Sequence, residues 1–404
     1  MQQKKRLIFS AIIVFISLLM GYTATAATKK IKVGYSIPLN VSFGVEINRA
    51  LKVAVPMLNK AGGITVKGER YDLEVKVLDD QYNADKARTN AERFIYQDGF
   101  KHIFYLGSVP VIAAFPVTEK AGALMLAGAS TDKHLMPPSR YTFRSAEGPL
   151  AKAVKFKFVR DHFPNAKTIV LTEQDDEAGK ADGRRVAKIA PYYNFKLLDT
   201  LYYPRGSKDF TSIATKIKSI NPDIVVFAAT EAGTAIGLQI KALRIAGYTG
   251  GVAKTEELNM KELKSVASNE QLEGLIGKVG PDLDPNVSQL FKDFKKNFIA
   301  EYGEWPTIYY GFLSALHMFK AAVEKADSLE VEDIAKAIEG GLEWETFSGG
   351  FMNIKRQDIG INRMAGCIAG ASFGVVTNGK HVYEKSYSIQ EVYRAASKVY
   401  GISR

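Results

Sequence analysis

The sequence contains few of the residues that form disulfides or hold metal ions. Its 404 residues include one cysteine, Cys367, and five histidines that are scattered along the chain. A single cysteine cannot form a disulfide within the chain, and a lone thiol of this kind is usually a small buried hydrophobic group. Structural zinc sites need several cysteine or histidine ligands at short spacings. We therefore expect no metal, no cofactor and no internal disulfide, and we expect the hydrophobic core to supply the stability.

Motifs of catalytic sites are also missing or stand in the wrong context. The stretch Gly370–Gly374 matches G-x-S-x-G, with Ser372 as the nucleophile, but a hairpin-like sequence follows where the motif needs a helix. Gly374–Lys380 matches most of a phosphate-binding P-loop, yet His381 replaces the final Ser or Thr. No G-x-G-x-x-G dinucleotide motif occurs. We expect no catalytic residues, and an exported hydrolase that uses Ser372 is the least favoured alternative.

The charge pattern lacks the clustering that nucleic-acid binding requires. The chain has a formal net charge of +11 at pH 7, from 54 Lys and Arg against 43 Asp and Glu. These basic residues are interspersed with acidic ones and form no long basic run, which is typical of a solvated surface. The composition therefore predicts no nucleic-acid partner.

Long apolar runs are absent except at the N-terminus. There, Leu7–Gly21 follows the basic Lys4–Arg6 and precedes an A-x-A sequence at Ala24–Ala26. This order is typical of a secretory signal peptide, and the apolar run is short for a membrane span. We predict a cleavable signal peptide over residues 1–26 and a periplasmic product; an uncleaved membrane anchor is the less favoured alternative.

The rest of the chain alternates between apolar runs of strand length and segments with helical spacing. Expected strands lie at 31–35, 71–78, 102–106, 123–127, 168–171, 195–201, 224–228 and 275–279. The pattern starts again after Ser145, which predicts two α/β lobes with parallel sheets and right-handed crossovers. Three helices are expected between residues 288 and 338, and Asn378–Gly379 predicts a late hairpin.

Two neighbouring strands of the first lobe end in glycine followed by small hydroxyl residues. These ends are Gly107–Ser108 and Gly128–Thr131. Ligands of open parallel sheets bind beyond the carboxyl ends of the strands, and glycine lets a ligand approach the backbone. Ser108 would cap the next helix, whose N-terminus favours an anion. The pattern suits a carboxylate pocket, although a simple helix cap and a simple turn explain these residues equally well.

Five short segments resemble the periplasmic leucine/isoleucine/valine-binding proteins, which are type I solute-binding proteins of ABC importers. The resemblance covers the whole chain after the signal peptide. The segments that carry it are Ile31–Leu39, Leu58–Ile64, Leu78–Asp80, Gly122–Leu126 and Phe143–Arg144.

The resemblance implies a two-lobed clamshell with three hinge crossovers. Lobe 1 would hold residues 27–146 plus 281–350, and lobe 2 residues 147–280 plus 351–404. Such a protein would capture a small solute between the lobes, act as a monomer and deliver the solute to an ABC permease in the inner membrane. A sensory ligand-binding module of the same fold is the alternative.

In lobe 1 the resemblance assigns roles to residues at the strand ends. Ser108 would receive the carboxylate of an amino-acid ligand, the Ala129 carbonyl would accept from its ammonium, and Thr131 would bind both groups. Ser130 would add a hydroxyl. Phe43 lies near an aromatic position that lines the family's cleft, although loop packing explains it equally well.

In lobe 2 the sequence departs from the family. The family's aromatic positions fall near Glu177 and near Glu231 or Ala232. Its acidic partner of the ligand ammonium falls at Glu256, or at Thr255 if the alignment shifts by one residue. Ordinary solvated loop charge is the alternative reading of these glutamates. The family's disulfide is also missing, since Tyr82 and Gly107 stand near its cysteine positions. Without aromatic walls a leucine-like side chain is disfavoured, so the expected ligand is an amino acid or a related small polar solute.

Overall fold

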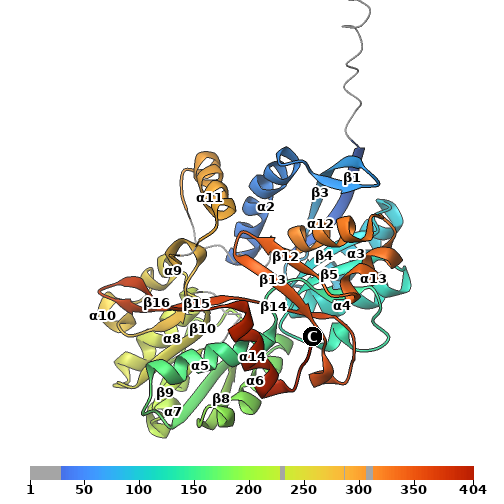
Figure 1. Cartoon of the computed structure of the whole chain (residues 1–404). Coiled ribbons are helices and arrows are strands. Elements are labelled where there is room, and N and C mark those ends of the chain that lie inside the picture. Colours follow the sequence, from blue (N-terminus) through green and yellow to red (C-terminus); the bar gives the residue numbers. More distant parts are fainter. Residues whose placement is uncertain (1–28, 228–232, 286, 306–312) are drawn as a thin grey trace, which may run out of the picture.

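The computed structural model describes residues 29–227, 233–285, 287–305 and 313–404. The expected signal peptide lies outside this part of the chain. Within the described residues, no helix combines the length and the apolar character needed to cross a bilayer. The described chain folds into two α/β lobes that a small third sheet joins (Figure 1).

Lobe 1 is built on a six-stranded sheet in the order β2-β3-β1-β4-β5-β6, which is parallel except for the edge strand β2. Its strands are β1 (Lys29–Ile37), β2 (Ile64–Val66), β3 (Glu69–Asp79), β4 (His102–Leu106), β5 (Leu124–Gly128) and β6 (Thr142–Arg144). Its helices are α2 (Ser42–Lys60), α3 (Ala84–Glu92), α4 (Ser108–Lys120), α11 (Gln289–Tyr302), α12 (Ser314–Ala326) and α13 (Val331–Glu339).

Both faces of this sheet are buried, as strand β4 illustrates. Phe104 and Leu106 pack into the core that α2, α11, α12 and α13 cover, whereas Ile103 and Tyr105 pack into the core under α3 and α4. Successive side chains of a strand point to opposite faces, so a continuous apolar run is required when helices cover both. The short apolar runs of the sequence are therefore central strands.

Lobe 2 is built on a seven-stranded sheet in the order β16-β15-β11-β10-β9-β7-β8, with an antiparallel hairpin at one edge. Its strands are β7 (Thr168–Gln174), β8 (Lys196–Tyr203), β9 (Ile224–Phe227), β10 (Gly251–Glu257), β11 (Ile276–Lys278), β15 (Ala371–Thr377) and β16 (Lys380–Tyr387). Its helices are α5 (Lys152–His162), α6 (Glu177–Tyr192), α7 (Thr211–Ile220), α8 (Gly233–Ile245), α9 (Met260–Lys264), α10 (Asn269–Leu272) and α14 (Ile389–Tyr400).

The third sheet lies between the lobes and consists of β12 (Glu343–Thr346), β13 (Gly349–Ile354) and β14 (Gly366–Ala369) (Figure 1). Its alternate side chains enter different cores. Phe351 and Cys367 pack into the core of lobe 1, whereas Met352 and Ile368 pack into that of lobe 2. Cys367 is a buried free thiol, as expected, and its Sγ donates to the Ala146 carbonyl over 2.7 Å. The pleat of one small sheet thus ties both lobes together.

The structure confirms the α/β fold class and the expected strands, and it adds elements that the sequence pattern did not reveal. The hairpin at Asn378–Gly379 is present, with φ values of 51° and 69°. Strand β10 was missed because its polar second half, Lys254–Glu257, breaks the apolar pattern although most of it is buried. The second of the three helices expected between residues 288 and 338, predicted over 308–325, begins at Ser314 in the described part, since residues 306–312 lie outside it.

Candidate functional site

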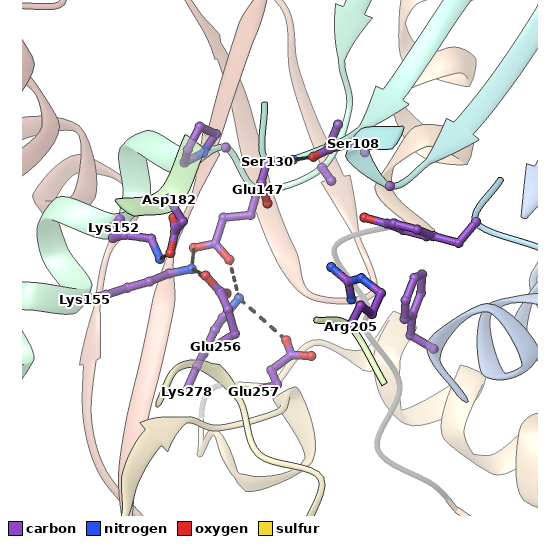
Figure 2. Close-up of a pocket in the computed structure, with 18 residues that line it drawn as sticks. Ser108, Ser130, Glu147, Lys152, Lys155, Asp182, Arg205, Glu256, Glu257 and Lys278 are labelled. Atoms are coloured by element: carbon purple, nitrogen blue, oxygen red, sulfur yellow. Dashed lines mark hydrogen bonds and ion pairs between the residues drawn. The ribbon is translucent and has the colours of Figure 1, made fainter. Parts of the chain in front are cut away.

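A cavity of about 140 Å³ lies between the two lobes, at the carboxyl ends of β4 and β5 on one side and of β10 and β11 on the other (Figure 2). The residues that line it come from lobe 1, from the first linker between the lobes, and from lobe 2. They are Phe43, Tyr82, Gly107, Ser108, Gly128, Ala129, Ser130, Ala146, Glu147, Gly148, Pro149, Lys152, Lys155, Asp182, Arg205, Glu256, Glu257 and Lys278.

The wall of lobe 1 is made of backbone and hydroxyl groups at two strand ends. Ser108 is the first residue of α4, and its Oγ accepts from the backbone N–H groups of Ser130 and Thr131 over 3.2 Å each. The expectation that Ser108 caps α4 is wrong, because Gly107 holds the cap position with no side-chain cap bond. Gly107 N–H also donates to the Gly128 carbonyl over 2.8 Å. Ser108 therefore joins the two loops that face the cavity.

Tyr82 fills the space beside Gly107. A Cβ on Gly107, which has a φ of 91°, would lie 2.5 Å from the Tyr82 ring. This contact is where the related proteins carry a disulfide according to the resemblance. Burial raises the pKa of Tyr82 to about 12, although the Arg205 guanidinium opposes the rise. Arg205 comes from lobe 2, lies 4.7 Å from the ring centroid and is held by Asp176 over 2.7 Å. A cation–π contact thus crosses from one lobe to the other.

The wall of lobe 2 is a chain of ion pairs that alternate in sign (Figure 2). Lys155 Nζ lies 2.6 Å from Glu256 Oε2 and 3.6 Å from Glu147 Oε1. Lys278 Nζ lies 2.5 Å from Glu147 Oε2 and 3.6 Å from Glu257 Oε1. The side chains of Lys155 and Glu147 are only 4% and 8% exposed. Buried charges are tolerated when they are paired in this way, so the chain forms one coupled unit.

Glu257 is the weakly paired end of this chain. Burial raises the pKa of Glu257 to about 7, and repulsion from Glu147 and Glu256 adds to this rise. Lys278 opposes the rise, but its Nζ lies closer to Glu147 than to Glu257. The Oε2 atom of Glu257 makes no hydrogen bond with any described residue. Burial opposes ionisation of Glu147 as well, yet Lys155 and Lys278 hold its pKa below the usual value. Glu257 thus brings to the cavity lining a carboxyl oxygen whose hydrogen-bonding capacity the described residues leave unused.

A second buried pair lies beside the chain. Lys152 Nζ binds the Asp182 carboxylate and donates to Thr255 Oγ1 over 3.2 Å. Burial would lower the pKa of Lys152, but Asp182 raises it above the usual value. Both side chains are 4% exposed, and each holds the other in its charged form. Lobe 2 therefore presents fixed, mutually neutralised charges to the cavity.

The structure brings seven of the eight candidate site residues to two places. Those on the cavity are Phe43, Ser108, Ala129, Ser130 and Glu256. Thr131 and Glu177 do not line it; instead Thr131 Oγ1 donates to Glu177 Oε1 over 3.1 Å, and Glu177 pairs with Lys133 over 2.6 Å. Glu231 lies outside the described residues.

Sequence reasoning missed most of the charged lining residues. One signal was available for two of them, since Lys152 and Lys155 lie three positions apart on α5 and share a helix face with buried apolar residues. Glu257 directly follows the candidate Glu256. Lys278 lies near the end of the expected strand 275–279, but nothing local shows that it pairs with Glu147, 131 positions away.

The G-x-S-x-G match and the expectation about metal ions can also be compared with the structure. Ser372 lies inside strand β15, where its Oγ binds Ser386 and Asp284, so the G-x-S-x-G match does not form a strand-to-helix turn. In the described part of the chain no group of three or more His, Cys, Asp or Glu could hold a metal ion.

A ligand-sized cavity between two α/β lobes, at the carboxyl ends of their strands, defines a binding protein of the clamshell type. The chain belongs to the periplasmic binding protein family, whose pattern matches residues 30–368. The resemblance to the leucine/isoleucine/valine-binding members is confirmed.

Relatives and solved structures agree with this assignment. The chain is 28% identical to Leu/Ile/Val-binding protein homolog 3 of Brucella melitensis, over 81% of this chain and 88% of the relative. It is 25% identical to the leucine-, isoleucine-, valine-, threonine- and alanine-binding protein of Pseudomonas aeruginosa, over 81% and 86%. The fold is that of the isoleucine complex of the branched-chain amino acid transporter substrate binding protein LivJ of Streptococcus pneumoniae (TM-score 0.71, 19% identity, 89% of this chain and 99% of that chain). The leucine binding protein LivK of Thermotoga maritima is equally similar (TM-score 0.72, 18% identity, 89% and 99%).

Proposed function

We propose that the protein is an exported, non-catalytic solute-binding protein that captures a small polar, amino-acid-like solute between its lobes and delivers it to an ABC permease in the inner membrane. The observation that carries this proposal is the cavity at the strand ends of both lobes. Residues 1–26 are the proposed signal peptide. The lobes comprise 27–146 plus 281–350 and 147–280 plus 351–404, and the working unit is a monomer.

The lobe 1 wall suits the two charged groups of an amino acid. Ser108 and Ser130 stand beside the N-terminus of α4, where hydroxyl and backbone N–H groups favour a carboxylate. The Ala129 carbonyl and the Glu256 carboxylate, on opposite sides of the cavity, suit an ammonium group. The names of the relatives, one of which is a leucine-, isoleucine-, valine-, threonine- and alanine-binding protein, support an amino acid as the class of ligand. Thr131 acts indirectly, through the loop that its N–H holds on Ser108.

The lining itself argues for a polar side chain on the ligand. Eight of its eighteen residues are charged: Glu147, Lys152, Lys155, Asp182, Arg205, Glu256, Glu257 and Lys278. An aliphatic group would leave the Oε2 atom of Glu257 without a hydrogen-bond partner, whereas a polar group could supply one. We therefore expect a solute with several hydrogen-bonding groups to bind more tightly than leucine, isoleucine or valine.

A thermal-unfolding experiment tests the proposal. Residues 27–404 are unfolded and refolded to remove captured solute, and the melting temperature is measured with aliphatic and polar amino acids, amides, urea, polyamines and aromatic acids. A ligand at 100 times its dissociation constant adds about 2.7 kcal/mol of stability. We expect polar amino acids or related solutes to give the largest shift.

Ser108→Ala provides the matching variant. It leaves the Ser130 and Thr131 N–H groups without their acceptor and removes a hydroxyl from the cavity, so the ligand-induced shift should disappear. Ser219→Ala, on the exposed face of α7, is the control and should keep the shift. A larger shift with leucine would contradict the polar-solute proposal. An unchanged melting temperature across the whole panel would contradict binding of an amino acid.

A further inference from the structure

A second cavity, of about 290 Å³, lies behind the loop that carries Ser130 into the solute cavity. It is lined by residues 131–133 and 136 of lobe 1, by α6 and Tyr400 of lobe 2, and by Asp358 and Ile359 of the segment that follows β13. It shares no lining residue with the solute cavity. Both lobes and the connection between them therefore meet around a separate space.

The charge around this cavity is positive. Four cationic side chains line it, namely Lys133, Arg184, Arg185 and Lys188, against the two carboxylates of Asp132 and Asp358. Glu177, just outside, pairs with Lys133 and more distantly with Arg184. Even with Glu177 included, cations outnumber anions by four to three, before the buried arginines behind the lining are considered.

The buried arginines behind the lining increase the positive charge around this cavity. Asp132 accepts from Arg144, Arg185 and Arg356, each over 2.8 Å. Arg356 also binds Asp358 over 2.8 Å, so this carboxylate is already engaged. Arg144 and Arg356 are almost completely buried, with 1% of each side chain exposed. Asp132 and Asp358 thus bind three buried guanidinium groups, and the Asp182 carboxylate lies 3.8 Å from Arg185. A buried charge without full compensation is costly.

Three groups around the cavity could each donate a further hydrogen bond. Tyr400 is 8% exposed and its Oη makes no hydrogen bond with any described residue. Burial raises the pKa of Tyr400, so the hydroxyl keeps a proton to donate. Arg185 Nη1 also makes no hydrogen bond in the described part of the chain; its nearest carboxylate oxygen, on Asp182, is 3.8 Å away. Lys188 forms no ion pair with a described residue, and its Nζ lies 5.1 Å from the Tyr400 ring centroid.

We propose that this second cavity binds a small oxyanion, a phosphate or a carboxylate, through Arg185, Lys188 and the Tyr400 hydroxyl. An oxyanion supplies the acceptors that these donors lack and offsets the positive charge. Phosphate and carboxylate share this chemistry, and the size of the cavity admits either.

A bound anion would also stabilise the loop that contains Ser130 and Thr131. Arg185 Nη2 donates to the Ser130 carbonyl, and Arg144 Nη2 donates to the Thr131 carbonyl. Both residues belong to the loop whose N–H groups bind Ser108 at the solute cavity. An anion that holds Arg185 in place therefore holds this loop. The anion site does not depend on the proposed transport function, but its influence on solute binding does.

The test uses inorganic phosphate and, in a second arm, succinate, each compared with sodium chloride at the same ionic strength. Binding to the refolded protein is measured by calorimetry, and exchange of the amide hydrogens in residues 128–133 is followed with and without phosphate. The variant is Lys188→Ala combined with Tyr400→Phe, which leaves Arg185 and its structural bonds intact. Lys180→Ala removes one positive charge from the same helix, away from the cavity, and serves as the control.

We expect saturable binding of phosphate or succinate to the natural protein and to Lys180→Ala, with slower exchange in residues 128–133. The double variant should bind at least about tenfold more weakly, since it loses a charged and a neutral hydrogen bond. Ser108→Ala should retain anion binding even where solute binding is lost, which separates this site from the proposed function. The proposal is overturned if neither anion binds saturably, if Lys180→Ala weakens binding as much as the double variant, or if the double variant binds normally.

Discussion

The two walls of the solute cavity differ in the chemical groups that they offer to a ligand. Lobe 1 offers backbone groups and hydroxyls that sit at the ends of β4 and β5, with Ser108 joining the two loops. Lobe 2 offers buried ion pairs, in which Lys155 and Lys278 share Glu147. The first wall is arranged by local backbone geometry and carries no charge that must be compensated. The second depends on every member of a charged chain being present.

Because one wall is neutral and the other is charged, mutations should affect the two walls differently. A hydrogen bond between neutral groups contributes about 1 kcal/mol net, and water can replace part of it. A buried charge whose partner is removed has no such replacement. Lobe 2 should therefore be the more fragile wall, and lobe 1 the one where effects depend on shape.

The largest expected effect is the loss of one partner from a buried pair in lobe 2. Lys152→Met leaves the Asp182 carboxylate buried without its ammonium partner, so the free energy of unfolding should fall by about 3–5 kcal/mol. Urea denaturation measures this change.

Two further variants sharpen that result. Lys157→Ala removes a lysine from the same helix whose pair with Asp161 is exposed, and it should cost at most about 1 kcal/mol. Lys152→Met combined with Asp182→Leu removes both charges and should recover most of the lost stability. A cost for Lys152→Met no larger than that of Lys157→Ala would contradict the contrast between the lobes.

The next effect is a dependence of stability on pH that comes from Glu257. Burial raises its pKa from 4.5 to about 7, so between these values the folded state holds a proton that the unfolded state has released. Stability should therefore fall as pH rises through this window, by an amount on the order of 3 kcal/mol, since one pKa unit corresponds to about 1.4 kcal/mol. Glu257→Gln should remove this slope and make the protein more stable at pH 8.

Asp80 provides the matching group in lobe 1. Burial raises its pKa from 3.8 to about 6, although hydrogen bonds from Ser36 and Tyr82 oppose the rise. Asp80→Asn should therefore remove a slope at lower pH and leave the one between pH 6 and 7 in place. Calorimetric melting curves from pH 4 to 8 separate the two. Identical profiles for Glu257→Gln and the natural protein would show that Glu257 is not the group responsible.

The smallest of these effects concerns the shape of the lobe 1 wall. In Gly107→Ala the new Cβ would meet the Tyr82 ring at 2.5 Å and the backbone would keep a φ of 91°, so we expect a loss of about 1–3 kcal/mol and weaker solute binding. Gly206 in lobe 2 has a φ of 84°, and a Cβ added there would meet no heavy atom within 4 Å. Gly206→Ala therefore reports the cost of the backbone angle alone, and equal costs for the two variants would mean that the Tyr82 contact has no influence.

Local sequence patterns predict the lobe 1 wall well. Gly107 and Ser108 follow an apolar strand, and Gly128–Thr131 follow its neighbour, so their place at one edge of a parallel sheet follows from the strand pattern. The role of Ser108 was only partly foreseen, since the sequence favoured a helix cap and the structure shows a bond to the adjacent loop. A cap is decided within a few residues, whereas this bond needs the two strands to lie side by side.

The same patterns do not predict the charged wall of lobe 2 or the small sheet between the lobes. The ends of β10 and β11 carry Glu256, Glu257 and Lys278, which look like loop charges until Lys155 and Glu147 are brought to them. The partners lie 101 and 131 positions apart in the chain, beyond the reach of any periodicity. Strands β12–β14 were missed because they are only four to six residues long and contain glycine or charged residues, so their apolar pattern is weak.

The sequence by itself determined the alternation of strands and helices, the two-lobed α/β class and the small residues at the strand ends, because each depends on a spacing of a few residues. Only the tertiary structure decided which charges became buried, which of them pair and which atoms face the cavity. Burial and pairing depend on distances between segments that are remote in the chain. In this protein those distances turn surface-like lysines and glutamates into the lining of the solute cavity.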